Sequence, residues 1–354
     1  MKIALFTFWH INNYGAEMQA YATIKALKQL GCDVEIIEYD FKNESTVGIK
    51  NKIIKLIRTL TPLNIKSQCF WRKYFPSVKY NSIKELQTSP PSADIYLVGS
   101  DQVWNLDITK DSYAVYFLDF GADAVRRISY GSSIGVSVWK FGEDKTIKIK
   151  NLLDKFASIS CREYEGIRII EDVFKKSASK VLDPTLLFTN YEELTGKVTI
   201  KNKLVYYPLF QDMEVMSFSR ELARLMGLEY EENGHTTTWI RGMGWNRNSV
   251  PQWITSIAQS QFVISQSFHG TVFSILYRKQ FIVIYNGNKA SRIIDLLRDL
   301  NLLDRYYHTV EDAKSSRVWE NRIDYDAVYQ RLDILRIKSW DYLKESLNIK
   351  IQVL

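Results

Sequence analysis

One histidine lies in a segment whose residue types suit acid–base chemistry on an anion. His269 stands in the sequence SQSFHGT, residues 265–271, directly after an apolar run. An apolar run followed by Ser267 predicts a strand that turns into a helix, with His269 in the first helical turn. There the imidazole and the N–H groups of the turn, including that of Gly270, can face an anion together. Histidine titrates near neutral pH, so we predict that His269 acts as a general acid.

An arginine marks a second segment of this kind. Arg162 lies in the sequence SCREYEG, residues 160–166, which also follows an apolar run. Its planar fork of N–H donors fits a phosphate or a carboxylate. Pairing with Glu163 or Glu165 is the alternative, and it is the commoner outcome for a single arginine. The segment therefore predicts either an anion-binding arginine or a local ion pair.

A third segment, GSDQVWN at residues 99–105, combines a carboxylate, two amides and an indole at an expected turn. Carboxylates and amides bind sugar hydroxyls, and an aromatic face stacks on the apolar side of a pyranose ring. We therefore predict an acceptor-binding set at Gln102, Trp104 and Asn105. Asp101 is our candidate for accepting a hydroxyl proton. The alternative is that Asp101 caps a helix and Trp104 belongs to the core.

The fourth segment is the sequence NNYG at residues 12–15, between an apolar run and an amphipathic stretch. Gly15 allows close approach of a ligand to the backbone, and the N-terminus of the following helix offers N–H groups. We include Asn13 and Tyr14 in the acceptor-binding set. A plain capped turn is the alternative.

Alternating strand and helix patterns would position these segments. The chain opens with an expected strand at 2–9, helix at 16–30 and strand at 33–39, which form a parallel βαβ unit. Further strands are expected at 95–99, 115–120, 128–131 and 157–160. Ligands of open parallel sheets bind beyond the carboxyl ends of the strands, where all four segments would lie.

The pattern restarts after Pro184 and predicts a second α/β domain. Strands are expected at 204–209, 262–265 and 281–285, and helices at 213–226, 250–258 and 271–276. We predict an α/β protein of two Rossmann-like domains, at residues 1–195 and 196–354. The helical stretch at 325–347 is expected to cross back from the second domain to the first.

Composition agrees with an ordinary globular protein. A length of 354 residues fits two domains of about 150 residues each, and 46% apolar with 25% charged residues is typical of this class. The three cysteines are too few for a disulfide framework, and the other histidines, His10, His235 and His308, form no metal-binding motif. We therefore expect no metal site. Without a run of about 18 apolar residues or a signal-peptide cleavage site, the sequence predicts a cytoplasmic protein.

The positive charge is concentrated in one segment. The net charge is +7, and residues 41–80 contain nine bases and one acid, so the rest of the chain is close to neutral. Four apolar residues there share a helical face and three aromatic residues follow: Ile49, Ile53, Leu56, Leu60, Phe70, Trp71 and Phe75. Such a helix binds an anionic membrane surface, at about 1 kcal/mol per base. The alternative is a helix packed on its domain with solvated bases. We expect no nucleic-acid partner, because no known nucleic-acid-binding module occurs.

Five short motifs follow one another in a characteristic order. They are Asn13-Tyr14-Gly15, residues 99–105, residues 160–164, Leu182-Asp183-Pro184-Thr185 and residues 267–271. Together they resemble the polysaccharide pyruvyl transferase family. The resemblance implies a two-domain fold like that of GT-B glycosyltransferases, with a cleft between the domains. It also implies transfer of the pyruvyl group of phosphoenolpyruvate onto two hydroxyls of a hexose, commonly galactose. The product would be a pyruvate ketal in a bacterial surface polysaccharide such as a capsule.

The resemblance extends to site residues. The family is thought to place an arginine, a histidine and a lysine around phosphoenolpyruvate, which match Arg162, His269 and Lys289, with Ser267 and Gly270 completing the predicted donor site. Lys279 is nearer to the histidine, but it lies at the end of the expected helix. Many members carry an aspartate at the position of Gln266, so a role given to that aspartate cannot be transferred to this chain.

The implied reaction needs no metal or organic cofactor. Protonation of the enol methylene makes C2 of phosphoenolpyruvate electrophilic, one sugar hydroxyl adds, phosphate leaves and the second hydroxyl closes the ketal. An acceptor carried on a lipid diphosphate would bring the protein to the inner face of the cytoplasmic membrane. One alternative function is a GT-B nucleotide-sugar glycosyltransferase of a polysaccharide locus. Another is a noncatalytic sugar-binding or assembly protein.

Overall fold

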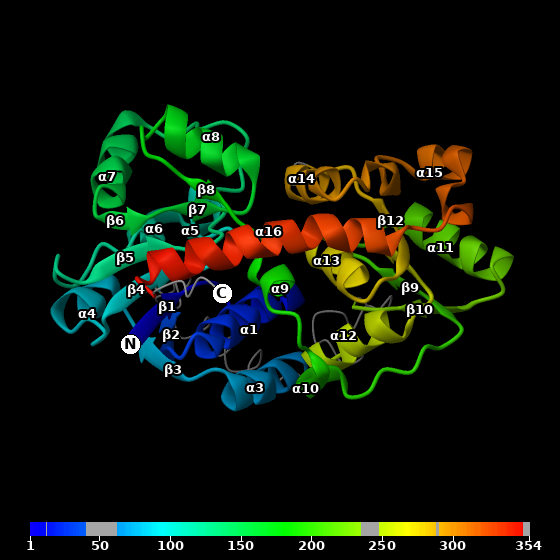
Figure 1. The fold of residues 1–354 in the computed structure, drawn as a ribbon, viewed down its shortest axis with the longest axis horizontal. Helices are drawn as coiled ribbons and strands as arrows, with labels where there is room; N and C mark the ends of the chain where they lie inside the picture. The colour runs from blue at the N-terminus through cyan, green and yellow to red at the C-terminus, as the bar shows by residue number, and fades with distance from the viewer. Residues whose placement is uncertain (12, 40–61, 235–247, 288–289, 350–354) are drawn as a thin grey trace, which may run out of the picture. The chain divides into compact units, whose positions relative to one another are not determined.

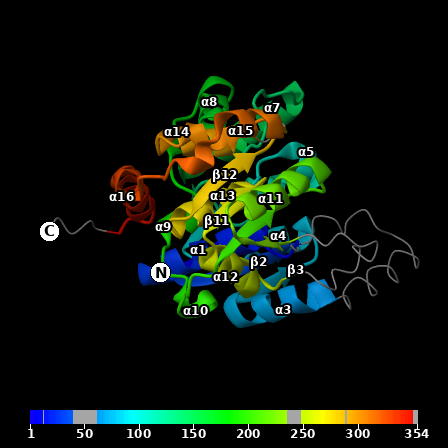
Figure 2. The ribbon, with the colours of Figure 1, turned by 90° about the vertical axis from the view of Figure 1, so that its right-hand side faces the viewer.

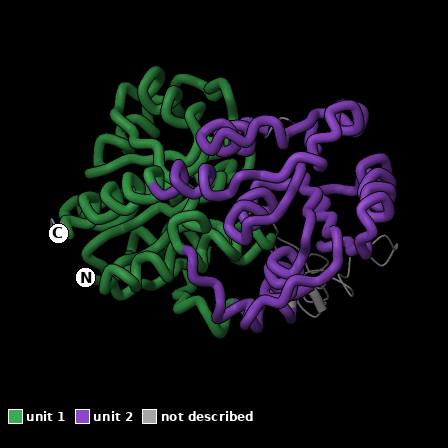
Figure 3. The backbone as a smooth tube through the Cα atoms, turned by 45° about the vertical axis from the view of Figure 1, so that its right-hand side comes forward, with its two compact units in different colours: residues 1–55, 71–188, 334–354 green, residues 56–70, 189–333 purple. Residues whose placement is uncertain are grey.

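The computed structural model describes residues 1–11, 13–39, 62–234, 248–287 and 290–349 (Figure 1). The described residues divide into two compact units, which Figure 3 draws in different colours. The described residues within 1–55, 71–188 and 334–354 belong to unit 1, and those within 56–70 and 189–333 belong to unit 2. Each unit is built on its own parallel sheet, so the expected α/β class is confirmed.

Unit 1 contains a six-stranded parallel sheet in the order β3-β2-β1-β4-β5-β6. The strands are β1 (Lys2–Phe6), β2 (Asp33–Tyr39), β3 (Ser77–Tyr80), β4 (Ile95–Val98), β5 (Arg126–Ser129) and β6 (Phe156–Ser158). A second, two-stranded sheet pairs β7 (Ser160–Cys161) with β8 (Ser179–Lys180). The order reverses at β1, which is the topology of a doubly wound nucleotide-binding fold.

Helices cover both faces of the unit 1 sheet, with α1 on one side and α7 and α8 on the other (Figure 1). The helices of this unit are α1 (Tyr14–Gln29), α4 (Ile83–Thr88), α5 (Leu106–Thr109), α6 (Tyr113–Tyr116), α7 (Glu143–Leu153), α8 (Tyr164–Asp172) and α9 (Pro184–Leu187). Ala4 and Phe6 of β1 join a buried apolar cluster with Ile149 of α7 and Ile170 of α8. Burial of this apolar cluster stabilises the packing of α7 and α8 against the strands.

Unit 2 contains a five-stranded parallel sheet in the order β10-β9-β11-β12-β13. Its strands are β9 (Lys203–Tyr207), β10 (Glu229–Glu232), β11 (Phe262–Ser265), β12 (Gln280–Ile284) and β13 (Tyr306–Tyr307). The central strands β11 and β12 run side by side (Figure 2). Apart from Ser265 and Gln280 at their ends they consist of buried apolar residues, as expected for strands covered on both faces.

The helices of unit 2 are α10 (Glu192–Thr195), α11 (Met213–Leu225), α12 (Val250–Gln259), α13 (Phe268–Leu276), α14 (Ser291–Asp299) and α15 (Val310–Ser316). Short 3-10 turns, η3 (Leu303–Arg305) and η4 (Val318–Glu320), flank β13 and α15. Val215 and Leu222 of α11 pack with Ile264 of β11 and Ala313 of α15 in the core of this unit. Two further helices, α3 (Pro62–Tyr74) and α16 (Tyr325–Ser346), contribute residues to both units.

The unit boundaries differ from the expected domain ranges of 1–195 and 196–354. Unit 1 extends to Phe188 because α9 packs against α1, where the rings of Phe188 and Tyr21 lie 6.1 Å apart. It also includes residues 334–354, because the second half of α16 is bonded into it. One such bond runs from the Leu182 N–H to Ser339 Oγ at 2.9 Å.

One expected strand is wrong. Residues 115–120 form the end of α6 and a buried loop instead of a strand. All apolar residues of this run are buried, so the chain is apolar there without belonging to a sheet. A short buried apolar run has the same composition in a strand and in a helix, so periodicity cannot separate the two.

The basic segment is only partly described. Residues 49–60, which carry the expected amphipathic helix, lie outside the described residues. The aromatic residues after it point inward: Phe70 and Phe75 are buried, and Trp71 donates its indole N–H to Glu17 at 2.9 Å. Burial contradicts a role for Phe70 and Phe75 at a membrane surface, whereas Trp71 is partly exposed and its role there stays a prediction. Within the described ranges, no helix combines the length and apolar content needed to cross a bilayer.

Candidate functional site

His269 lies at the carboxyl end of β11, as the sequence predicts. Strand β11 ends at Ser265, and α13 begins at Phe268. Ser267 caps the helix: its Oγ accepts the Gly270 N–H at 3.5 Å, and its carbonyl accepts the Thr271 hydroxyl at 2.9 Å. His269 is thereby held in the first turn of α13, where it is buried with its ring edge-to-face with Phe268.

Gly270 is required by packing. A Cβ atom on Gly270 would lie 2.7 Å from Cδ1 of Tyr207 on β9 and still closer to Ser265 Oγ. Only a glycine therefore lets α13 approach the sheet this closely. The predicted contact of Gly270 with phosphoenolpyruvate stays a prediction, and its N–H is directed to Ser267 in this structure.

A carboxylate from another loop lies beside this segment. Gln266 donates its side-chain amide to Asp212 Oδ2 at 3.1 Å and accepts the Tyr206 hydroxyl at 3.1 Å. Asp212 also caps α11 by accepting the Val215 N–H. Burial raises the pKa of Tyr206, and the charge of Asp212 raises it further, so the phenol stays a hydrogen-bond donor. Position 266 is not an aspartate in this chain, but the carboxylate of Asp212, which follows β9, lies next to Gln266.

A cation near His269 was missed by the sequence reasoning. Arg292, at the start of α14, places its guanidinium 5.8 Å from the centroid of the Phe268 ring. The predicted lysine, Lys289, lies outside the described residues. Lys279 precedes β12, at the amino end of the strand and away from the His269 edge. The signal that could have found Arg292 is its place in the helix that follows the β12 loop, since that loop shares an edge with His269.

Arg162 lies in a buried network of unit 1. Its Nη1 donates to Asp183 Oδ2 at 2.5 Å and to Ser100 Oγ at 3.0 Å, and its Nη2 donates to Asp101 Oδ1 at 3.2 Å. The neighbouring Glu163, expected as its alternative partner, is farther away at 3.9 Å. Burial alone would lower the pKa of Arg162, but Asp183, Asp101 and Glu163 together raise it, so the guanidinium stays charged.

The network leaves little of Arg162 accessible to a ligand. The arginine side chain is 1% exposed and that of Asp183 is 0% exposed, whereas Asp101 is 17% exposed. The predicted contact of Arg162 with phosphoenolpyruvate stays a prediction, and in this structure it would require the guanidinium to exchange a carboxylate for the ligand. Asp183 was not assigned a role from the sequence, although it belongs to one of the quoted motifs.

The structure contradicts the predicted sugar contact of Trp104. This side chain is 0% exposed, it stacks on Phe117 with ring centroids 5.3 Å apart, and its indole N–H is donated to the Tyr116 carbonyl. Both faces of the indole are therefore used by the core. The alternative of a core residue is the correct one, because a short loop after β4 brings Trp104 under α6.

The other predicted acceptor residues are mostly interior. Gln102 and Asn105 are buried and bonded to each other at 3.2 Å, and Tyr14 is buried in α1. Asn13 is exposed, and its side-chain oxygen caps α1 by accepting the N–H groups of Gly15 and Ala16. Asn13 and Asp101 thus remain the predicted acceptor-side residues with exposed surface.

Comparison with known proteins identifies the family. A family model described as polysaccharide pyruvyl transferase matches residues 13–288, which is most of the chain. The chain belongs to the polysaccharide pyruvyl transferase family. This confirms the resemblance drawn from the five motifs and makes the chain a polysaccharide pyruvyl transferase. A comparison with curated proteins finds no match.

Solved structures show the same fold at low sequence identity. A Listeria monocytogenes protein described as a UDP-N-acetylglucosamine 2-epimerase superposes with a TM-score of 0.58 at 7% identity, covering 99% of this chain and 98% of that one. Arabidopsis thaliana UGT89C1 with UDP-L-rhamnose gives 0.53 at 8% identity and 99% of both chains. The S. aureus MnaA structure with UDP gives 0.52 at 9% identity, with 99% and 97% covered. The transferase therefore has a two-domain GT-B-like fold.

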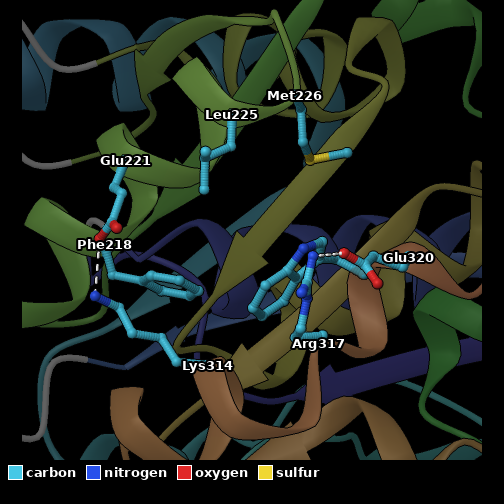
Figure 4. Close-up of a pocket in the computed structure, with 8 residues that line it drawn as sticks. Phe218, Glu221, Leu225, Met226, Lys314, Arg317 and Glu320 are labelled. Atoms are coloured by element: carbon cyan, nitrogen blue, oxygen red, sulfur yellow. Dashed lines mark hydrogen bonds and ion pairs between the residues drawn. The ribbon is translucent and has the colours of Figure 1, made fainter.

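A hollow on unit 2 is separate from the predicted donor segment. It measures about 470 Å³ and is lined by residues of α11, α15 and η4 (Figure 4). Its two cations are each paired with a glutamate: Lys314 with Glu221 at 2.8 Å, and Arg317 with Glu320. Paired cations disfavour this hollow as the site of a small dianion. Among the described residues, no cluster of three or more metal-ligand side chains occurs either.

Proposed function

We propose that the transferase moves the pyruvyl group of phosphoenolpyruvate onto a hydroxyl pair of a hexose. The product is a cyclic pyruvate ketal on a bacterial surface polysaccharide, with galactose as the expected hexose. Membership of the polysaccharide pyruvyl transferase family, over residues 13–288, is the observation that supports this proposal.

The donor is proposed to bind at the start of α13. Phosphoenolpyruvate carries a phosphate and a carboxylate, so its site needs cations and N–H donors. The first turn of α13 supplies N–H groups beside His269, and Ser267 fixes that turn. Lys289 and Arg292 are the proposed cations, the second because its guanidinium lies over Phe268.

Two side chains carry the proton transfers in this proposal. His269 gives a proton to the enol methylene, which makes C2 electrophilic. A sugar hydroxyl adds at C2 and gives its proton to Asp101. The C2–O bond to phosphate breaks, phosphate leaves with its electron pair, and the second hydroxyl adds at C2 and loses its proton to close the ketal. Phosphoenolpyruvate and the diol are thus converted into the ketal and inorganic phosphate, without a redox step.

The acceptor is proposed to be carried on a lipid diphosphate. This would place the transferase at the inner face of the cytoplasmic membrane, with the basic residues of 41–80 near anionic lipids. Co-sedimentation with anionic liposomes at low salt tests the membrane contact. Recovery of all the protein in the supernatant would rule it out.

The donor is tested by calorimetric titration and by phosphate release with a galactoside acceptor. We expect phosphoenolpyruvate to bind, and His269→Ala to abolish turnover while binding remains measurable. His308→Ala is the matched control, because His308 is exposed at the end of β13. Near-normal turnover of His269→Ala would remove His269 from the mechanism. Binding of a nucleotide sugar in place of phosphoenolpyruvate would favour glycosyl transfer, and binding without any phosphate release would favour a noncatalytic sugar-binding protein.

A further inference from the structure

Four side chains of unit 1 form a closed cluster with one exposed member. Arg162, Asp183 and Ser100 are buried, and each contacts the other two. Asp101, held by Arg162 Nη2, is the member with exposed surface, at 17% of its side chain. The cluster therefore ends at a carboxylate that a ligand can reach, while the guanidinium lies behind it.

The bonds of Asp183 explain why the arginine points this way. Asp183 Oδ2 accepts from both Arg162 and Ser100, and its Oδ1 accepts the N–H and the hydroxyl of Thr185 at the start of α9. Each oxygen of the Asp183 carboxylate therefore accepts hydrogen bonds from two donors. Because a charged hydrogen bond at 2.5 Å fixes Nη1, only the Nη2 side of the fork is turned toward Asp101.

Asp101 is held in an unusual backbone conformation. Its φ is +79°, a region that non-glycine residues rarely occupy. Its carbonyl accepts the Ser133 N–H at 2.9 Å, and it forms a β-bridge with Ser132, which in turn bridges to Cys161. Asp101 therefore joins the loop after β4 to the loop after β5, and Ser132 in turn joins that second loop to β7. Conformations of this kind persist where the surroundings enforce them, and they cluster at active sites.

The carboxylate of Asp101 uses one oxygen for these contacts. Its Oδ1 accepts from Arg162 Nη2 and from the Gln102 N–H at 2.8 Å. No side chain or N–H group of the described residues is bonded to Oδ2, so this oxygen is available to a ligand. Two donors on one oxygen fix the rotation of the carboxylate, which is the requirement for a group that must meet a hydroxyl at a defined angle.

We propose that Arg162, Asp183 and Ser100 are positioning residues that hold Asp101 for the acceptor hydroxyl. Arg162 then acts through Asp101 and does not touch phosphoenolpyruvate. This inference rests on the proposed function, in which Asp101 accepts the hydroxyl proton. It assigns a role to Asp183 and Ser100, and it replaces the predicted donor contact of Arg162 with an acceptor-side role.

A double-mutant cycle tests whether Asp183 acts through Asp101. We expect Asp101→Asn to lower kcat about 100-fold, as for loss of a general base, and Asp183→Asn to lower it about tenfold by releasing the guanidinium. The double variant should be no slower than Asp101→Asn alone, within about a factor of three. A residue needed only for the fold would instead multiply the two losses.

Calorimetric titration with phosphoenolpyruvate separates positioning from direct binding. We expect Arg162→Lys and Asp183→Asn to leave the Kd for phosphoenolpyruvate within about twofold of the parent value while kcat falls, because neither touches the donor. Asp107→Asn is the matched control, since it removes an exposed acid of α5 that pairs with Lys140. Its kcat and Kd should both be unchanged.

The outcomes that overturn the inference are distinct from failure of the proposed function. A tenfold weaker Kd in Arg162→Lys, or multiplied losses in the double variant, would make Arg162 a donor ligand or the cluster a fold element. If Asp183→Asn does not fold, Ser100→Ala in the parent and in Asp101→Asn answers the same question, because it removes the bonds from Ser100 to Arg162 and Asp183. Absence of phosphate release in the parent protein would refute the proposed function, and the positioning role with it.

Discussion

Replacing one buried lysine should stabilise the transferase at neutral pH. Lys279 lies between α13 and β12 and is 5% exposed. Burial lowers its pKa from the usual 10.5 to about 8. Within the described ranges no acid pairs with Lys279, so burial is not offset by an ion pair. We therefore expect Lys279→Met, which keeps the length of the side chain, to raise the free energy of unfolding.

The size of the gain follows from the two pKa values. A pKa of about 8 in the folded chain against 10.5 in the unfolded chain means that charging Lys279 costs up to about 3 kcal/mol more in the fold. Relaxation of the protein around a buried charge recovers part of this cost, so the expected gain is about 2 kcal/mol at pH 7. Between pH 8 and pH 10.5 the unfolded chain binds more protons, so the stability of the parent protein rises with pH in this window and the gain shrinks.

Urea unfolding of the parent and of Lys279→Met, at about pH 7 and about pH 10, measures this difference. The variant should be more stable at the lower pH and nearly equal to the parent at the higher one. Lys338→Met, at an exposed position of α16, controls for the loss of a lysine. An equal gain at both pH values, or a loss of stability at the lower pH, would refute the reasoning from burial.

Three substitutions test packing and helix capping in the two units. Gly270→Ala should cost about 1 to 2 kcal/mol in thermal unfolding, because overpacking against Tyr207 outweighs the helix preference of alanine, whereas Gly142→Ala has open space and should be tolerated. Equal melting temperatures for the two variants would contradict this. Trp104→Ala should lower the free energy of unfolding by about 3 to 5 kcal/mol and leave the KM for the acceptor unchanged. A raised KM without loss of stability would instead support the predicted contact of Trp104 with the sugar. Ser249→Ala removes a capping box and should cost about 1 kcal/mol, measured by urea unfolding; no change would show that the cap of α12 is dispensable.

The sequence predicted the central strands of both sheets because their signals are local, but it missed the edge strands β3, β10 and β13. An apolar run followed by an amphipathic stretch repeats in both halves, and each repeat became a strand and a helix of a parallel sheet. The strand predicted at 115–120 was wrong because these residues are apolar as part of the buried core and do not pair in a sheet. The unit boundaries also could not be read locally, since the second half of α16 belongs to unit 1 through bonds to residues far away in the chain.

The candidate site shows the same limit. His269 was placed correctly at a strand end, because strand and cap are adjacent in sequence. The partner of Arg162, in contrast, is Asp183, which follows it by 21 residues in the sequence, after α8. The carboxylate beside Gln266 is Asp212, from a different strand loop. Trp104 was misassigned because its exposure depends on α6, which the sequence did not reveal as a helix.

The path of α16 has a consequence for the order in which the units can fold. The Arg336 side chain donates to the Leu186 carbonyl, and the Tyr342 hydroxyl donates to the Ser129 carbonyl, so unit 1 uses residues made near the end of translation. All five strands of unit 2 have been synthesised by residue 307. During synthesis, unit 2 can therefore close its sheet while unit 1 still waits for its last helix. A fragment that stops at residue 333 would keep the strands of both units and lose the part of α16 that fastens unit 1.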